Sequence, residues 1–355
     1  MVNKIIVDRE YEIVEKQHIY RGLHSIVYRV KTETGYYILK ELFPNEIHNI
    51  SKCPRNKFNC PCLKNQSVVI DTCAFIQECE REIEACRIAY VDEAEKSNSN
   101  YFFKSELLSK VCDNDTYAQY VLVDTSSGVN LRDYAKEILP NYDSEKYLSC
   151  IAELMSSACS ALARMHNVKR IHLDLKASNM YVCKVDHPYI RIIDLGSSFD
   201  LKKTNYDNRN FAYITTEGYQ SRRIKKLVRL SNESVDLFKT ALSELSFKDD
   251  IYAMAETFFE LLFGTTFSFD PDFGYPGYCE CEESECSYGS VYEKLILKIC
   301  SKAAYEKYNT IEEMKEDIDS LIKIINREGY DSSKKVMVNH LMKLPSCWLT
   351  LMKRE

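Results

Sequence analysis

The pattern of hydrophobic and polar positions is first typical of strands and then, over most of the chain, typical of helices. Within residues 10–43, IVYRV and YYILKELF are rich in β-branched and aromatic residues, and Thr34-Gly35 between them is typical of a turn. From Asp71 to Tyr90 the apolar residues recur at helical spacing, which predicts an amphipathic helix with Asp71 as its N-cap. Two further strands are expected at about 101–112 and 117–124.

Helical spacing dominates the remainder of the chain. The stretch from Ser144 to His166 predicts a long helix, which follows a short one in LRDYAKEIL. Short strands are expected around NMYVCKV and YIRIID, and the pattern beyond about residue 230 is mostly helical. A strand-rich first third before a helix-rich remainder is the pattern of two lobes with a cleft between them.

Composition and charge narrow the class of protein. The chain has 355 residues, 45% hydrophobic and 28% charged, which indicates a packed globular protein rather than general disorder. The net charge of −6 argues against a nucleic-acid partner, because such proteins usually carry a basic footprint. No stretch of about 18 residues is free of charge, so no transmembrane segment is expected, and the first residues lack the apolar core of a secretory signal.

The fifteen cysteines are expected to be free thiols in a reducing compartment, because the chain shows no export signal. We therefore expect a cytoplasmic protein, and delivery into a host cell as an effector is left open. Zinc sites favour close cysteine pairs and four ligands, which neither cysteine cluster offers. The two clusters are Cys53, Cys60 and Cys62, and Cys279, Cys281 and Cys286.

The segment IHLDLKASNMYV, residues 171–182, carries the strongest chemical signal. It holds Asp174, then Lys176 two residues later and Asn179 three residues after that. RIIDLG follows and contains Asp194. Phosphoryl transfer needs a carboxylate that orients the attacking hydroxyl, oxygen ligands for a divalent metal and a cation on the moving phosphate. The set supplies these groups and indicates phosphoryl transfer.

This arrangement resembles the eukaryotic-type protein kinase family, whose pattern is H-R-D-L-K-x-x-N followed by D-F-G. The resemblance covers roughly residues 10–325. It implies an α+β, protein kinase-like fold of two lobes, with a small β-rich N-lobe and a larger α-helical C-lobe. It also implies ATP and Mg²⁺, with Asp174 as the catalytic base, Lys176 on the γ-phosphate, and Asn179 and Asp194 as metal ligands.

The family's ATP-positioning lysine corresponds to Lys40, at the end of a strand, and its partner is a glutamate on the next helix. Glu78 and Glu82 both qualify by position. Glu82 is preferred, because the family has an apolar residue four positions later and Cys86 fits that slot. Choosing Glu78 would put the charged Glu82 there, which would need a partner.

The rest of the expected nucleotide site is eroded. Gly22 alone survives of the three glycines in the phosphate-covering loop, and Val27 matches the valine that packs on the adenine. Val123 corresponds to the gatekeeper, and Asp124 opens the hinge whose backbone would hold the adenine.

The stretch KDDIYAMAETFFELLFG, residues 248–264, resembles the family's buried central helix, in which Asp250 would brace the catalytic loop. Small-molecule kinases of related fold lack this pattern, so the resemblance favours a protein substrate. Lys176 favours Ser/Thr over Tyr as the acceptor. His166 and His172 are interpreted as packed structural histidines.

Two departures from the family concern the activation segment. Leu173 replaces the arginine that reads an activation-loop phosphate, so we expect activity that does not depend on such phosphorylation. TTEGYQSRR, residues 215–223, ends in Arg222-Arg223 where the family has Pro-Glu. That glutamate normally pairs with an arginine, whose position Lys307 takes here. Two cations cannot form this bridge, so the region must be held differently.

A basic run follows and precedes a predicted helix, SVDLFKTALSEL. One interpretation of the run is a solvated helix face, and the other is a dock for an acidic or phosphorylated protein substrate, since arginine forks suit such anions. The run comprises Arg222, Arg223, Lys225, Lys226 and Arg229.

The favoured hypothesis is a Ser/Thr protein kinase that transfers the γ-phosphate of Mg·ATP. A pseudokinase acting as a nucleotide-binding scaffold or partner regulator is the alternative, because the glycine loop and the Pro-Glu pair are lost. A kinase fold that modifies a small molecule is the third. The expected division is an N-lobe at 1–125, with one regulatory helix and a Cys-containing insertion at 44–70, a C-lobe at 126–325 and a C-terminal extension at 326–355.

Overall fold

We describe the protein from a computed structural model, over residues 4–6, 10–18, 25–42, 105–111, 117–124, 128–138, 144–183, 188–202, 215–230, 240–263 and 291–328. The chain divides into two compact units, Met1–Gly128 with Asp194–Ser198, and Val129–Ile193 with Phe199–Glu355. The lobe boundary after residue 125 and the extension from 326 stay predictions. The insertion at 44–70, the helix expected at 71–90, both cysteine clusters and most of the extension lie outside the described residues.

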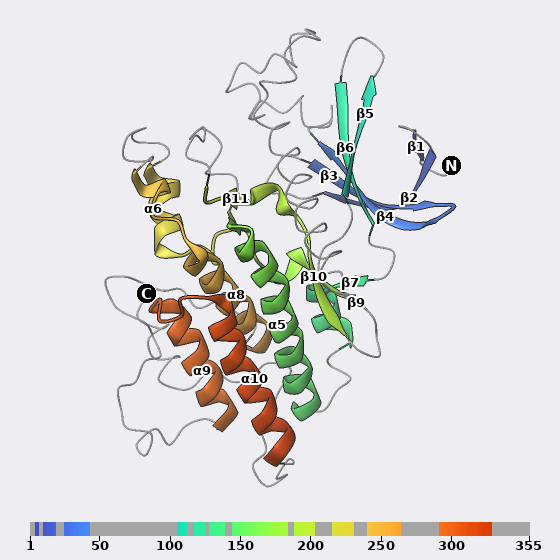
Figure 1. Cartoon of the computed structure of the whole chain (residues 1–355). Coiled ribbons are helices and arrows are strands. Elements are labelled where there is room, and N and C mark those ends of the chain that lie inside the picture. Colours follow the sequence, from blue (N-terminus) through green and yellow to red (C-terminus); the bar gives the residue numbers. More distant parts are fainter. Residues whose placement is uncertain are drawn as a thin grey trace, which may run out of the picture. The chain divides into compact units, whose positions relative to one another are not determined.

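The first unit contains an antiparallel sheet with strand order β1-β2-β3-β4-β6-β5 (Figure 1). The strands are β1 Lys4–Ile6, β2 Glu10–His18, β3 Ser25–Thr32, β4 Gly35–Leu42, β5 Ser105–Val111 and β6 Tyr117–Asp124. Gly35 has φ 146°, a backbone conformation that favours glycine, which explains the tight turn between β3 and β4. The expected strands and turn are therefore confirmed.

The register of the sheet follows from which residues can be buried. Tyr28 and Leu39 lie opposite each other on β3 and β4, and both are buried. Since successive residues alternate between faces, the neighbouring positions fall on the other face. There Val27 lies opposite Lys40, and Ile38 lies opposite Val123.

The second unit is mainly helical. Four helices run side by side in it: α5 Ser144–Asn167, α8 Phe247–Phe263, α9 Val291–Ala304 and α10 Ile311–Glu328 (Figure 1). All residues of α8 from Ile251 to Phe259 are buried. A helix that is buried on all sides over this stretch is surrounded by protein, as the resemblance of residues 248–264 to the family's central helix implies.

Short elements bracket the segment that carries the chemical signal. β8 Arg170–Ile171 precedes it and pairs with β11 Phe199–Asp200, while η5 Ala177–Asn179 ends it. β9 Met180–Cys183 then pairs with β10 Tyr189–Ile192 and β7 Gly128–Asn130 in a sheet of order β10-β9-β7. The Asn179 carbonyl accepts a hydrogen bond of 2.9 Å from the backbone N–H of Ile193. These strands fix both ends of the loop at residues 172–179.

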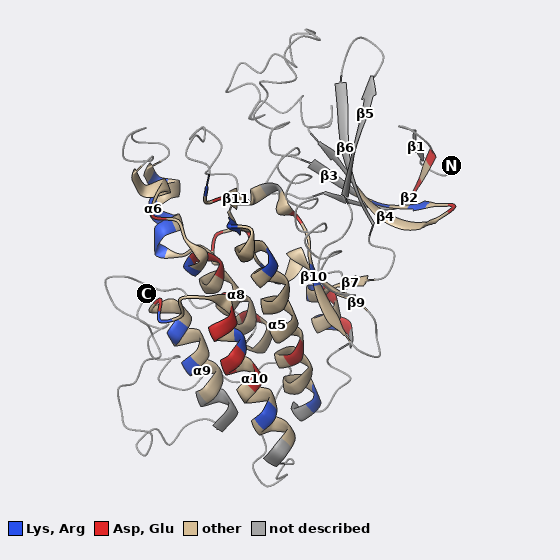
Figure 2. Cartoon of the chain, viewed as in Figure 1, with Lys and Arg blue, Asp and Glu red and all other residues tan. Residues whose placement is uncertain are grey.

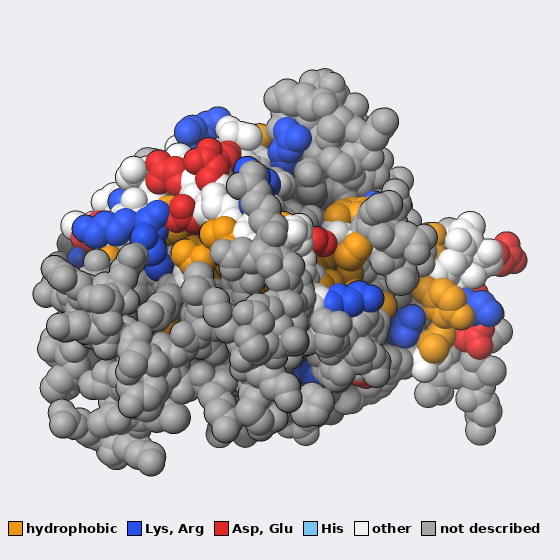
Figure 3. Space-filling model, turned by 90° about the horizontal axis from the view of Figure 1, so that it is seen from below, with side chains coloured by type: hydrophobic (Ala, Val, Ile, Leu, Met, Phe, Trp, Pro, Cys, Tyr) orange, Lys and Arg blue, Asp and Glu red, His pale blue; other side chains and the backbone are white. Residues whose placement is uncertain are grey.

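The basic run forms a helix, α6 Arg222–Leu230, in agreement with the interpretation of the run as a helix face. Ile224, Leu227 and Leu230 face inward and are buried, whereas the lysines and arginines give the helix its basic colour (Figure 2). The helix predicted within SVDLFKTALSEL falls mostly outside the described residues. On the face in Figure 3, basic and acidic side chains lie close together over much of the described surface.

Three remaining short helices are α4 Leu131–Asp133, η3 Tyr134–Ile138 and η6 Leu195–Ser197. In the part of the chain that the structure describes, no helix is long and apolar enough to span a membrane. Cys150, Cys159, Cys183 and Cys300 are buried thiols. Burial raises the pKa of the Cys159 and Cys300 thiols, so both stay protonated and pack as small apolar side chains.

Candidate active site

The carboxylate of Asp174 is the centre of a compact polar cluster in the second unit. Lys176 Nζ donates to its Oδ2 over 2.8 Å, and Asn179 Nδ2 donates to the same oxygen over 3.0 Å. Thr216 Oγ1 donates to Oδ1 over 2.6 Å. Asp174 is 9% exposed, so its negative charge lies in a largely desolvated place and is held by three donors.

The two oxygens of Asp174 differ in what they can still accept. Each carboxylate oxygen offers about two lone-pair directions. Lys176 and Asn179 occupy those of Oδ2. Among the described residues, Oδ1 accepts a hydrogen bond from Thr216 alone. One acceptor direction on Oδ1 therefore remains for a further hydroxyl.

Thr216 is a site residue whose contacts the motif analysis did not foresee. Its Oγ1 also lies 2.6 Å from Lys176 Nζ, which donates to it, so Thr216, Lys176 and Asp174 form a closed triangle. The sequence offered one signal for Thr216, because residues 215–221 match the end of the family's activation segment. That match aligns Thr216 but does not say which side chain it contacts.

The backbone of the loop at residues 172–179 is fixed by Asp250, in the first turn of α8. Asp250 is fully buried, and its carboxylate accepts the backbone N–H of His172 at 2.8 Å and of Leu173 at 2.9 Å. His166 Nε2 lies 3.0 Å from Oδ2 of the same carboxylate. The expected brace of the catalytic loop by Asp250 is therefore present.

His172 supports the loop without exposing a reactive nitrogen. Its Nδ1 accepts the backbone N–H of Asp174 at 3.2 Å, and its Nε2 donates to the Ile193 carbonyl at 3.0 Å. Both ring nitrogens are used and the residue is fully buried, as expected of a packed structural histidine. His166 is also buried and stacks on Phe247, with ring centroids 4.4 Å apart.

Leu173 takes the place of the family's arginine and points into an apolar cluster. It is 4% exposed and adopts φ 67°, in the left-handed region that non-glycine residues rarely occupy. The backbone N–H of Leu173 and that of the preceding His172 both donate to Asp250, and these hydrogen bonds support that conformation. The cluster includes Ile171, Leu173, Phe199, Ile224, Leu227, Leu230, Ala241, Leu242 and Leu245. The loop therefore contacts α6 through apolar packing.

The expected metal ligands have suitable chemistry. Both amide hydrogens of Asn179 are used by Asp174, through its carbonyl at 2.8 Å and its Oδ2, which leaves the amide oxygen as the ligand atom. Asp194 directly precedes η6 with φ 62° and does not cap that helix with its side chain. A carboxylate and an amide oxygen are the donors that Mg²⁺ takes in proteins. The two residues belong to different compact units.

The nucleotide-site predictions fall in the first unit. The backbone register places Val27 beside Lys40, Val123 beside Ile38, and Asp124 beside Tyr37. The strands thus bring the Val27, Lys40 and Val123 positions to one face of the sheet. Gly22 and Glu82 lie outside the described residues.

The end of the segment at residues 215–223 is held by an ion pair of opposite polarity to the family's. Arg223 Nε donates to Asp249 Oδ1 at 3.0 Å, and its Nη1 donates to Glu306 Oε1 at 2.7 Å. Lys307, which the sequence aligns with the family's arginine, is exposed, and its neighbour Glu306 makes the contact instead. This region is held differently from the family's, as expected. The residue that holds it is Arg223, which sequence analysis identified only as a departure from the family's glutamate.

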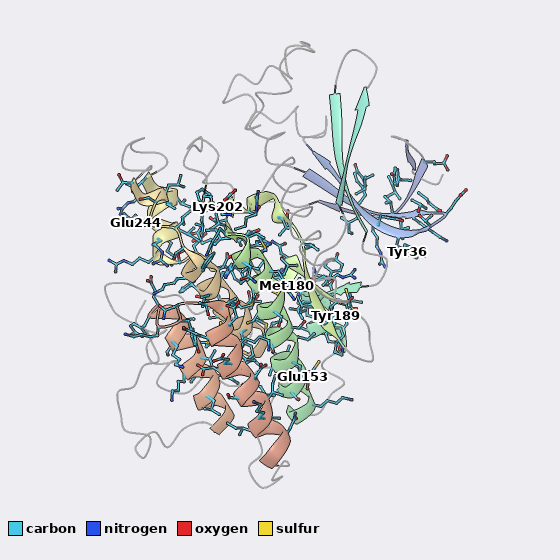
Figure 4. All side chains as sticks on the ribbon, in the orientation of Figure 1. Tyr36, Glu153, Met180, Tyr189, Lys202 and Glu244 are labelled. Atoms are coloured by element: carbon cyan, nitrogen blue, oxygen red, sulfur yellow. The ribbon has the colours of Figure 1, made fainter. Side chains whose placement is uncertain are left out.

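The five cations of the basic run are not equivalent. Arg223 is ion-paired as above, and Lys226 Nζ contacts both oxygens of Glu244 at 2.8 and 3.0 Å. Figure 4 shows Glu244 beside α6. Arg222 and Lys225 are exposed and lie three positions apart on the helix, so they share a face.

Comparison with known proteins gives a structural likeness only. No protein-family model matches the chain, and no curated protein matches it. Among solved structures, the chain is similar to a double mutant of the PknI kinase domain of Mycobacterium tuberculosis. The match covers 91% of this chain and 99% of that chain, at 13% sequence identity and a TM-score of 0.48. That structure is of a kinase domain, and the α+β class expected from the sequence agrees with the β-sheet of the first unit and the helices of the second.

Proposed function

We propose that this protein is a protein kinase that transfers the γ-phosphate of Mg·ATP to a Ser or Thr hydroxyl. The observation that supports this most directly is the environment of Asp174. Its carboxylate is fixed by Lys176, Asn179 and Thr216, and Oδ1 keeps one acceptor direction among the described residues. A fixed carboxylate with one vacant lone pair suits the task of orienting one incoming hydroxyl.

In this proposal each side chain has a separate task. The acceptor hydroxyl donates its hydrogen bond to Asp174 Oδ1 and gives up its proton there as the new oxygen–phosphorus bond forms. The bond between the γ-phosphorus and the bridging oxygen breaks, and ADP leaves. Lys176 Nζ, 2.8 Å from Asp174 Oδ2, offsets negative charge on the moving phosphoryl group. Mg²⁺, when bound, would neutralise phosphate charge, and Asn179 and Asp194 would hold it.

The cosubstrate would bind to the first unit. Lys40, with Glu82 as its partner, would hold the α- and β-phosphates below a loop that keeps Gly22. Val27 and Val123 would pack on the adenine, and Asp124 would begin the hinge. The shared sheet face of the Val27, Lys40 and Val123 positions supports this arrangement.

Activity without activation-loop phosphorylation is part of the proposal. Leu173 offers no charge to a phosphate, and its side chain is buried in the apolar cluster. The contacts of Thr216 with Asp174 and Lys176 are present in the unmodified chain. A phosphate on the segment would therefore have no arginine at position 173 to bind.

For the protein substrate, we propose recognition of acidic or phosphorylated groups by the exposed face of α6. Arg222 and Lys225 are the candidates there, because Arg223 and Lys226 are already ion-paired within the protein. Peptides that differ only in acidic residues test this, and Arg222→Ala with Lys225→Ala should reduce the preference for the acidic peptide.

The proposal is tested by Asp174→Ala, with transfer of labelled γ-phosphate to a Ser/Thr peptide as the measurement. Loss of the base should lower turnover by about 10²–10⁴-fold, with nucleotide binding by thermal shift unchanged. Asp133→Ala, which removes an exposed carboxylate on α4, is the matched control. Wild-type turnover by Asp174→Ala would refute the mechanism. Nucleotide binding without transfer by the wild type would favour the pseudokinase.

A further inference from the structure

The first turn of α8 carries two adjacent buried carboxylates that hold two different parts of the site. Asp250 accepts the backbone N–H groups of His172 and Leu173 in the catalytic loop. Asp249 instead accepts hydrogen bonds from the side chains of Ser221 and Arg223, at the end of the segment that contains Thr216. Both carboxylates are fully buried. One helical turn therefore holds both the loop that contains Asp174 and Lys176 and the segment that contains Thr216.

Asp249 needs a positive partner because its charge is desolvated. Burial raises the pKa of its carboxyl, and Arg223 is the strongest of the groups that lower it again. Burial alone would lower the pKa of the Arg223 guanidinium, but Asp249 and Glu306 outweigh it and raise that pKa. Arginine is always protonated in proteins, so Arg223 is the cation that makes an ionised Asp249 tolerable.

Besides Asp249 on α8, the Arg223 side chain contacts the turn after α9. Its Nη1 donates to Glu306 Oε1 at 2.7 Å, in the turn that follows α9. Lys248 Nζ donates to the Glu306 carbonyl at 3.0 Å, which ties that turn back to α8. In the Arg223–Asp249 pair the side chains are 17% and 0% exposed, whereas those of Lys226, also on α6, and its partner Glu244 are both at least 40% exposed. The first pair is thus partly desolvated and the second is an ordinary surface pair.

The segment from Thr216 to Arg223 is short and contains hydrogen bonds of its own. Ser221 Oγ accepts the N–H of Ile224 at 3.2 Å, which joins Asp249 to the start of α6. The N–H of Tyr219 donates to the Thr216 carbonyl at 3.2 Å, in a turn that contains Gly218 at φ 95°. Four residues separate Thr216 from Ser221, and the Tyr219–Thr216 hydrogen bond restricts the backbone between them.

We propose that Arg223 and Asp249 are positioning residues for phosphoryl transfer: they form an anchor of inverted charge that holds Thr216 against Asp174 and Lys176. This inference rests on the proposed kinase activity for its kinetic part. The anchor acts on the protein-acceptor side, so its loss should reduce kcat/KM for the peptide far more than it changes the KM for ATP. The family's own residue at this position, glutamate, should be the worst replacement, because it would face Asp249 and Glu306.

The test compares single variants of Arg223 with a rescuing double variant. We expect Arg223→Glu to lower kcat/KM for the peptide by at least about 100-fold, Arg223→Ala by about 30-fold, and Arg223→Lys by less than about 5-fold. Arg223→Ala with Asp249→Asn should recover activity to within about 10-fold of wild type, because the unpaired buried charge is then gone while the Ser221 contact remains. Lys226→Ala, on the same helix, is the matched control and should stay within about 2-fold.

Hydrogen exchange provides a readout that does not require catalysis. The amides of Tyr219, Ile224 and Lys225 are hydrogen-bonded within this segment, and Arg223→Ala should accelerate their exchange by about 10-fold or more while the double variant restores it. An inactive wild type whose exchange still responds this way would contradict the kinase proposal and keep the anchor. An active wild type in which Arg223→Ala and Arg223→Glu behave like Lys226→Ala would overturn the anchor. Equal changes in the KM for ATP and for the peptide would overturn its positioning role.

Discussion

The catalytic loop at residues 172–179 and the segment at residues 215–230 are held by adjacent carboxylates, yet by different kinds of partner. Asp250 holds the loop through backbone N–H groups of His172 and Leu173. Asp249 holds the segment through the side chains of Ser221 and Arg223. A backbone N–H is present whatever the side chain, whereas a side-chain partner changes with the sequence. The loop can therefore diverge at position 173 without losing its brace, but position 223 can change only together with its partner.

The two substitutions that depart from the kinase pattern follow this difference. At position 173 the arginine is replaced by a leucine, and the backbone contacts to Asp250 remain while the side chain packs against α6. At position 223 the glutamate is replaced by an arginine, and the contacting partners are the acids Asp249 and Glu306. The first change replaces a charged side chain by an apolar one that packs in the core, and the second places a cation where the family has an anion, opposite two acids.

The largest expected effect comes from removing the backbone brace. Asp250→Ala leaves the buried N–H groups of His172 and Leu173 and the His166 ring without their acceptor. Each unsatisfied buried group costs about 1–3 kcal/mol, so the free energy of unfolding should fall by about 3–5 kcal/mol. Urea denaturation measures this. Asp250→Asn keeps one carbonyl oxygen and should lose less, and equal denaturation midpoints for wild type and Asp250→Ala would break the comparison.

A smaller effect is expected when the family's arginine is restored in the loop. Leu173→Arg would place a guanidinium among Ile171, Leu227 and Leu242, where no counter-charge is part of the cluster. The free energy of unfolding should fall by about 2–4 kcal/mol, because a charge is buried without a partner. Leu173→Met keeps the volume and the apolar character and should cost less than about 1.5 kcal/mol. Equal thermal stability of these two variants would show that the position is not held by apolar packing.

The parts of the fold that could be predicted from the sequence are those with a clear period or a backbone function. The β-branched and aromatic residues of IVYRV and YYILKELF predicted β3 and β4 with their turn, and the resemblance of residues 248–264 to the family's central helix implied that α8 is buried. The contact of Asp250 with the loop was also predicted, from the resemblance of residues 248–264 to the family's central helix, and its hydrogen-bond donors are backbone N–H groups. Local pattern and a conformational motif were sufficient in each case.

The contacts that sequence reasoning missed join side chains far apart in the chain. Glu306 lies 83 positions from Arg223, and Thr216 lies 42 positions from Asp174, so no local pattern connects them. The alignment with the family even favoured Lys307, the neighbour of the correct residue. The positive φ of Glu306, 56°, marks a local turn that changes which of two adjacent side chains faces Arg223, and such a turn has no clear signature in EKYN.

The smallest expected effect concerns a side-chain contact outside both regions, where solvent weakens the interaction. On α10, Asp319 accepts hydrogen bonds from Ser156 of α5 at 2.5 Å and from Lys315 at 2.6 Å. Burial alone would raise the pKa of Asp319, but these two donors outweigh it and hold the pKa below its ordinary value. A carboxyl with a lowered pKa in the folded state stabilises the protein above its unfolded pKa of about 4, and this stabilisation is lost as the pH falls through the folded value.

Asp319→Asn should therefore cost less than about 1 kcal/mol in the free energy of unfolding near neutral pH, and the difference from wild type should vanish in acid. Urea denaturation at several pH values measures it, and Glu316→Gln, at an exposed carboxylate of the same helix, is the control. The Ser156–Asp319 contact can be compared with the Arg223–Asp249 contact, because both join side chains of different helices. The main difference is that Asp249 is fully buried and Asp319 is not. If Asp319→Asn lowered the free energy of unfolding as much as Arg223→Ala does, burial would not explain the strength of the contact between Arg223 and Asp249. A difference that grew in acid would contradict the lowered pKa itself.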